Sequence, residues 1–168
     1  MTCILAIDPG ISGALAFYYT EVPDRVSVLD MPLLDGDVNP HALRDLINGY
    51  AADFAIIEHV SPMPKEGVSS VWRFAAAYTT ARITVMLMGI PVTLVRPNMW
   101  KKALLLKSGK DGKEQSRSRA ISMFPECASR FARKKDHNRA EAALLAVYAA
   151  TTRKGLQYEL PEHRNPSP

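Results

Sequence analysis

Three carboxylates stand where acidic side chains are uncommon. Asp8 ends the apolar run CILAID and is followed at once by a turn-forming stretch, PGISG. Glu58 interrupts FAIIEHV, and Glu141 lies in the alanine-rich stretch AEAALLAVYAA. Acids are depleted in strands, and burying an unpaired carboxylate is costly. Each of these acids therefore needs a partner, which is either a basic side chain or a metal ion.

Asp136 is a fourth candidate, because it precedes the same alanine-rich stretch as Glu141. An Asp at this place also suits helix capping, just as an Asp before Pro9 suits a turn. Oxygen ligands gathered from separate segments are typical of Mg²⁺ or Mn²⁺ rather than zinc. Two such ions about 4 Å apart would activate a water and stabilise the leaving 3′ oxygen of a phosphodiester. The acids thus predict metal-assisted phosphoryl chemistry.

The elements that must position these acids follow from hydrophobic patterning and turn-forming residues. Strands are predicted over residues 2–8, 14–20, 25–31, 54–60 and 91–95. Helices are predicted over residues 40–50 with Asn39 as the cap, over 69–88 as a buried helix ended by Gly89, around Trp100, and over 113–123 and 137–153. The lysine- and glycine-containing segment 108–113 is predicted to be a loop. Three hairpin-linked strands, followed by strands alternating with helices, indicate an α/β fold with a mixed sheet.

Length and composition indicate one domain. The chain has 168 residues, of which 47% are hydrophobic and 23% charged, so a single core is expected over residues 1–155. The proline-containing tail, 156–168, is expected to be unstructured. The first apolar run meets a charge at Asp8, which argues against a signal peptide or membrane span and favours a cytoplasmic protein. Cys3 and Cys127 have neither the number nor the spacing of a disulfide framework or zinc site.

Positive charge is concentrated in the second half of the chain. Between Arg96 and Arg139, thirteen Lys or Arg residues accompany four acids, a net charge of +9, whereas the whole chain carries +4. Such a region suits either a polyanion-binding surface or a solvated helix face. The aromatic residues Trp72, Phe74 and Trp100 could stack on nucleic-acid bases or pack in the core.

Three segments together resemble the acidic motifs of RuvC-like Holliday junction resolvases, within the RNase H-like superfamily: IDPGISGALAF, AIIEHV and DHNRAEAALLA. The segments GIPVTLVRPNMWKK and GKDGKEQSRSRAISMFP resemble the connecting stretch, so the likeness covers roughly residues 2–150 and is closest to phage-type members. The resemblance implies an RNase H-like fold, in which three antiparallel meander strands and then parallel strands form a five-stranded mixed sheet flanked by helices. It also implies a homodimer that resolves Holliday junctions as an Mg²⁺- or Mn²⁺-dependent endonuclease, with two metal ions per site.

The resemblance assigns Asp8 and Glu58 as catalytic metal ligands by position. The third motif departs from the family pattern of two acids three residues apart, because Asn138 stands three residues before Glu141. We expect Glu141 and then Asp136 to complete the catalytic and metal-binding set, with His137 and Asn138 as alternatives. His137 and Asn138 share a helical face with Glu141, whereas Asp136 would lie about 140° away on a regular helix.

The basic stretch then supplies the expected DNA contacts: Lys101, Lys102, Lys107, Lys110 and Lys113. The helix over 69–88 suits a dimer interface and ordinary core equally. Other functions stay open, namely an RNase H-like nuclease acting on flaps or structured RNA, and a non-catalytic module that binds branched DNA. An actin-like ATPase has a similar first motif, but it needs a second domain and phosphate loop for which 168 residues leave no room.

Overall fold

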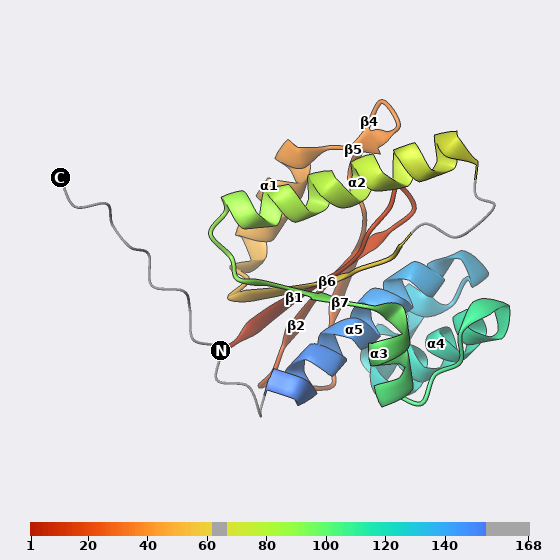
Figure 1. The fold of residues 1–168 in the computed structure, drawn as a ribbon. Coiled ribbons are helices and arrows are strands. Elements are labelled where there is room, and N and C mark those ends of the chain that lie inside the picture. Colours follow the sequence, from red (N-terminus) through yellow and green to blue (C-terminus); the bar gives the residue numbers. More distant parts are fainter. Residues whose placement is uncertain (62–66, 154–168) are drawn as a thin grey trace.

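A five-stranded mixed sheet forms the centre of the computed structural model, which describes residues 1–61 and 67–153 (Figure 1). The strand order is β3-β2-β1-β6-β7. The strands are β1 (Cys3–Asp8), β2 (Ala14–Tyr19), β3 (Ser27–Asp30), β6 (Phe54–Glu58) and β7 (Val92–Val95). The first three pair antiparallel, whereas β6 and β7 continue the sheet in parallel from β1. The predicted α/β fold with a mixed sheet is confirmed.

Helices cover both faces of this sheet (Figure 1). The helices are α1 (Pro40–Tyr50), α2 (Val68–Leu87), α3 (Pro97–Ala103), α4 (Gly109–Met123) and α5 (His137–Arg153). Two short 3₁₀ segments, η1 (Pro125–Phe131) and η2 (Lys134–Asp136), connect α4 to α5. Helices α1 and α2 pack on one face, and α5 crosses the other with α3 and α4 beside it.

The alternation of side chains along each strand divides the core in two. In β1, Leu5 and Ile7 join the cluster under α1 and α2, whereas Ile4 and Ala6 join the cluster under α5. In β6, Phe54 and Ile56 face α5. The same alternation places Asp8 and Glu58, the last residues of β1 and β6, on the α5 face. Strand periodicity alone therefore directs both carboxylates towards one helix.

The start of α1 follows its sequence signal. The side-chain oxygen of Asn39 accepts hydrogen bonds from the backbone N–H groups of His41 and Ala42, each at 3.1 Å. Pro40 occupies the first helical turn, where the missing N–H of proline costs nothing. The predicted Asn cap is confirmed.

Local structure differs from the prediction in the basic region. Residues 108–113 are not a loop, because α4 already begins at Gly109. A Cβ atom on Gly112 would lie 2.1 Å from the carbonyl oxygen of Lys107, so glycine lets the preceding backbone pack directly on the helix. Lys113 is consequently inside α4 rather than its first residue. Two short strands, β4 (Leu33–Leu34) and β5 (Asp37–Val38), were also not predicted.

Helix α2 is buried along only one face, so the prediction of a buried helix is wrong. Ala77, Ala81, Thr84 and Val85 are buried. The opposite face exposes large apolar side chains, namely Val68, Trp72, Ile83, Met86 and Leu87. Within residues 1–61 and 67–153, no helix is long and apolar enough to span a membrane. The predicted tail, 156–168, lies outside the described residues.

Candidate active site

Asp8 stands at the end of β1, immediately before a tight turn. The backbone N–H of Gly13 donates to the carbonyl oxygen of Gly10 at 3.0 Å. A Cβ atom on Gly13 would lie 2.2 Å from the carbonyl oxygen of Asp8, so a larger residue cannot follow the same path. The glycine in the turn therefore lets β2 return directly beside Asp8, with Ala14 as its partner in the sheet.

Glu58 ends the neighbouring parallel strand. Ile7 is paired with Ile57, so the next residues, Asp8 and Glu58, end adjacent strands side by side. Glu58 is only 6% exposed. The indole Nε1–H of the buried Trp100 in α3 donates to Glu58 Oε1 at 2.8 Å. This bond satisfies one carboxylate oxygen inside the protein.

Glu141 reaches the same place from α5. It is 8% exposed and lies in the second turn of α5, which packs on β1 and β2. The ammonium group of Lys101 lies 2.9 Å from Glu141 Oε1, and the hydroxyl of Ser116 in α4 donates to the same oxygen at 3.4 Å. Helices α3 and α4 thus contribute the polar partners of the buried carboxylates.

The three carboxylates affect one another electrostatically. Burial raises the pKa of Asp8 well above its ordinary value, and the charges of Glu58 and Glu141 raise it further, against the opposing effect of Lys101 and Lys113. Burial also raises the pKa of Glu58; the Trp100 hydrogen bond and the Lys101 charge oppose this, and Glu141 adds to it. These couplings place Asp8, Glu58, Glu141, Lys101 and Lys113 within one electrostatic cluster.

The donor chemistry of this cluster fits a hard divalent cation, since three carboxylates that repel one another offer only oxygen ligands. The side-chain positions fit less well. Among the described residues, no group of three or more His, Cys, Asp or Glu side chains lies close enough together to hold a metal ion. Instead, Glu58 and Glu141 are bound by Trp100 and Lys101.

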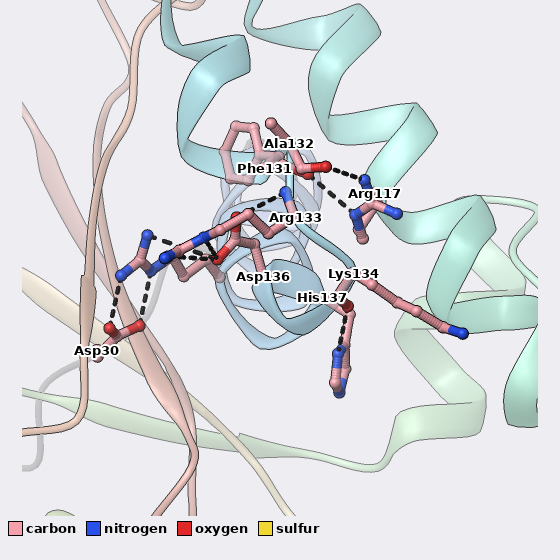
Figure 2. A network of polar contacts seen from close by, with 9 residues as sticks. Asp30, Arg117, Phe131, Ala132, Arg133, Lys134, Asp136 and His137 are labelled. Atoms are coloured by element: carbon pink, nitrogen blue, oxygen red, sulfur yellow. Dashed lines mark hydrogen bonds and ion pairs between the residues drawn. The ribbon is translucent and has the colours of Figure 1, made fainter.

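The structure does not bring Asp136 to the other three acids. Figure 2 shows its buried carboxylate bound by Arg133, whose backbone N–H donates at 2.9 Å and whose guanidinium donates at 2.9 Å. Arg139 lies 3.7 Å from Asp136 and bridges to Asp30 at 2.5 Å. Burial alone would raise the pKa of Asp136, but the Arg133 hydrogen bonds and nearby positive charges lower it. Asp136 therefore closes the turn that leads into α5.

The two alternative residues of the third motif also differ in position. The imidazole Nδ1 of His137 lies 3.2 Å from the carbonyl oxygen of Lys134, within its own turn. The Asn138 side-chain amide donates to the carbonyl oxygen of Ser12. Asn138 thereby ties the start of α5 to the turn after β1, and it lines the same cavity as Asp8, of about 440 Å³.

The predicted DNA-binding lysines fall into two groups. Lys101 is turned into the carboxylate cluster, with its side chain 13% exposed. Lys102, Lys107 and Lys113 are exposed, and Lys113 is close enough to Asp8 to lower its pKa. The Lys110 side chain lies outside the described part of the structure. The lysines therefore border the carboxylates on the side formed by α3 and α4.

Sequence reasoning missed the polar partners of the carboxylates. The sequence predicts base stacking or core packing for Trp100 and indicates no role for Ser116. A signal existed for Trp100, because a buried indole N–H requires an acceptor. The cavity beside Asp8 also includes Arg73 and Phe74 from α2, whereas Trp72 is 75% exposed.

Comparisons with known proteins agree with this fold. No protein-family model matches the chain, and no curated protein matches it. The solved structure of Thermus thermophilus RuvC in complex with a Holliday junction substrate superposes with a TM-score of 0.64 at 16% identity, over 90% of this chain and 96% of that chain. A second T. thermophilus RuvC structure gives a TM-score of 0.62 at 17% identity, with the same coverage of both chains.

A eukaryotic protein shows the same likeness. The yeast mitochondrial Holliday junction resolvase Ydc2 superposes with a TM-score of 0.51 at 16% identity, over 89% of this chain and 79% of that chain. These superpositions cover about nine-tenths of the chain. The chain therefore has the fold of the RuvC-like Holliday junction resolvases.

Proposed function

We propose that this protein is a divalent-metal-dependent endonuclease that resolves Holliday junctions or other branched DNA. The observation that carries the proposal is the meeting of Asp8, Glu58 and Glu141 from three separate elements, beside lysines of α3 and α4, in a RuvC-like fold. The fold neighbours support branched DNA as the substrate, because they are a RuvC bound to a Holliday junction and a mitochondrial resolvase.

The chain's own residues have distinct roles in this proposal. Asp8, Glu58 and Glu141 would hold Mg²⁺ or Mn²⁺, and Asn138, which lines the same cavity as Asp8, would be the further candidate ligand. A bound ion would neutralise charge on the phosphate oxygens and lower the pKa of an attacking water. Trp100 holds one oxygen of Glu58, while Lys102, Lys107 and Lys113 bind phosphates of the DNA strand. The number of two metal ions per site remains a prediction.

We also propose that the protein acts as a homodimer through α2. The exposed residues Val68, Trp72, Ala75, Thr79, Ile83 and Met86 recur at helical spacing along one face of this 20-residue helix. An exposed face of this kind, apolar except for Thr79, is typical of an interaction surface, and a pair of such helices would relate two active sites by a twofold axis. The cytoplasmic location and the likeness to phage-type members remain predictions.

The experiment that tests this function compares labelled four-way junction, flap, duplex DNA and structured RNA as substrates, each with Mg²⁺ or Mn²⁺. We expect paired nicks on the junction that require metal and disappear in Asp8→Asn and in Glu58→Gln. Asp45→Asn is the matched control, because Asp45 is an exposed carboxylate in α1 and its loss should leave cleavage intact.

Other outcomes select the alternatives. Preferential cutting of flaps or RNA would support a nuclease but would exclude Holliday junctions as its preferred substrate. Tight junction binding without cutting under either metal would favour a non-catalytic DNA-binding module. Cleavage that survives in Asp8→Asn would contradict the proposed site itself.

A further inference from the structure

Lys101 occupies an unusual place for a DNA-binding lysine. Its ammonium group lies 2.9 Å from Glu141 Oε1, and the exposed fractions of the two side chains are 13% and 10%. The ammonium also lies 5.2 Å from the centre of the Trp100 ring, whose indole binds Glu58. Two consecutive residues of α3 thus contact two different carboxylates of the cluster.

Stability alone does not explain a buried ion pair at this place. Removing both charges from water costs free energy that their attraction rarely exceeds. The neighbouring residue Lys102 shows that a lysine on α3 can remain in solvent, since it is exposed. Lys101 instead provides positive charge that acts on Glu141, Glu58 and Asp8 together.

We propose that Lys101 is a resident cation of the carboxylate cluster, which holds Glu141 until a divalent metal ion takes its place and frees the ammonium group for a phosphate of the substrate. This inference rests on the proposed metal-dependent function. It accounts for the absence of a ready-made ligand group among the carboxylates of the described residues, since Lys101 and a metal ion would compete for the Glu141 carboxylate.

Competition between Lys101 and a metal ion predicts a direction of change in metal affinity. A lysine that only binds DNA would predict no such change. Removing the Lys101 charge should tighten metal binding in the absence of DNA, because the carboxylates lose their internal counter-charge. A positive charge within about 4–6 Å of a carboxylate changes its affinity for a proton by about 10- to 1,000-fold, and it opposes a bound cation in the same way. We therefore expect the dissociation constant for Mn²⁺ to fall about tenfold in Lys101→Met.

The test is calorimetric titration of Mn²⁺ into the full chain without DNA, at one fixed pH, for the wild type, Lys101→Met and Lys102→Met. Lys102→Met removes the same charge from the next residue of α3, and its Mn²⁺ affinity should stay within about twofold of wild type, since exposed charges are strongly screened. Lys101→Gln provides the same comparison if Lys101→Met does not fold.

Thermal unfolding supplies an independent readout. Without metal, Lys101→Met should melt at a lower temperature than Lys102→Met, because it leaves buried carboxylates without their counter-charge. Added Mn²⁺ should then raise the melting temperature of Lys101→Met more than that of wild type, since a tighter ligand stabilises the folded state more.

The outcomes separate this inference from the proposed function. If both Lys101 variants bind Mn²⁺ as weakly as the wild type or more weakly, and the wild type still cuts DNA with metal, the exchange of Lys101 for a metal ion is wrong. The proposed nuclease function would stand. Absence of Mn²⁺ binding in the wild type and in every variant, together with cleavage that needs no metal, would overturn both. Tighter binding in Lys101→Met and Lys101→Gln but not in Lys102→Met would support the exchange.

Discussion

At the scale of single residues, the carboxylates of the candidate site lower the stability of the folded protein. Asp8, Glu58 and Glu141 are brought together in a place where burial and mutual repulsion raise the pKa values of Asp8 and Glu58. Asp136 shows the opposite behaviour, because its guanidinium partners lower its pKa. Asp8 and Asp136 therefore differ in what surrounds their carboxylates, and their substitution should have opposite effects on the free energy of unfolding.

Asp8→Asn should stabilise the protein while it abolishes cleavage. A pKa raised above its value in the unfolded chain means that the folded state favours the protonated form, so stability falls as pH rises through the folded-state pKa. Asn resembles that protonated form. We expect its free energy of unfolding, measured in urea at pH 8 without metal, to exceed wild type by about 0.5–2 kcal/mol, the usual gain from one stabilising change.

This gain should shrink as pH falls and should vanish well below the unfolded-state pKa of about 3.9, where Asp8 is protonated in both states. Asp45→Asn serves as the exposed control and should show no gain at pH 8. A wild type as stable as Asp8→Asn at pH 8 would mean that the Asp8 carboxylate is not under electrostatic strain.

Asp136→Asn should have the reverse effect on stability. The lowered pKa of Asp136 contributes stability above the unfolded-state pKa, and this contribution is lost as pH falls through the folded-state pKa. Hydrogen bonds to a charged group are worth about 1.5–3 kcal/mol, so we expect a loss of that size in urea unfolding at pH 7 and a smaller one below about pH 4. The folded variant should still cut DNA; loss of cleavage in a folded Asp136→Asn protein would return Asp136 to the catalytic set.

At the scale of elements, α4 is positioned by the absence of a side chain. Gly112 allows the backbone at Lys107 to pack against α4, and α4 carries Ser116 to Glu141 and Lys113 towards Asp8. Helix α2 instead leaves an apolar face exposed. These two helices therefore allow separate tests of how the site is positioned and how two copies associate.

Gly112→Ala should destabilise the protein although alanine is the better helix former. The new Cβ atom would lie 2.1 Å from a backbone oxygen, so we expect a loss of about 3 kcal/mol, at the upper end of the usual range for single substitutions. Gly49→Ala in α1 is the matched control, because nothing lies within 4 Å of its Cβ position. The higher helix propensity of alanine should there raise the free energy of unfolding by up to about 1 kcal/mol. Thermal unfolding of both variants measures the difference. A higher melting temperature in both would mean that the close packing of the Lys107 backbone on Gly112 is not required.

Met86→Glu should weaken self-association through α2. Met86 is 51% exposed on the apolar face, and placing a charge in a helix–helix interface should raise the dimer dissociation constant at least about tenfold, or about 1.4 kcal/mol. Analytical ultracentrifugation over a concentration series measures this constant. Asn48→Glu, on the exposed side of α1, introduces the same charge elsewhere and should leave the constant unchanged; equal dimerisation in both variants would exclude α2 as the interface.

At the scale of the whole molecule, charge is distributed unevenly around the sheet. The strongly basic region between Arg96 and Arg139 includes α3 and α4, so it borders the carboxylate cluster on one side. This arrangement suits a polyanion whose backbone crosses the site, because positive charge attracts phosphates while the carboxylates remain available to cations.

Junction binding should therefore depend steeply on salt. Each phosphate neutralised on duplex DNA contributes about −0.9 to the slope of log K against log salt concentration. A Lys102→Met/Lys107→Met double variant should reduce the magnitude of the slope by about 1.8 in fluorescence anisotropy titrations. Arg44→Gln, in α1 on the opposite face of the sheet, is the control and should leave the slope unchanged. An unchanged slope in the double variant would show that Lys102 and Lys107 do not contact DNA phosphates.

The sequence by itself determined the strands, the mixed sheet and the three acids that meet, because periodicity fixes which face a strand residue occupies and an acid in an apolar strand is conspicuous. It predicted Asp8, Glu58, Glu141 and then Asp136 as the site; electrostatic coupling links the first three, and their role as metal ligands stays a prediction. It ranked Asp136 after Glu141 but could not exclude it, because Asp136 precedes the helix that carries Glu141 and an Asp that caps a helix is not distinguished by sequence from a metal ligand.

Only the tertiary structure decided what each charged side chain contacts. Arg139, which lies beside Asp136, bridges to Asp30, a residue 109 positions earlier in the chain. The placement of Lys101 on Glu141 joins residues 40 positions apart, and its neighbour Lys102, identical in type, remains in solvent. Local pattern specifies an element and its faces, whereas the partner of a long, flexible side chain depends on which elements the completed fold brings within reach.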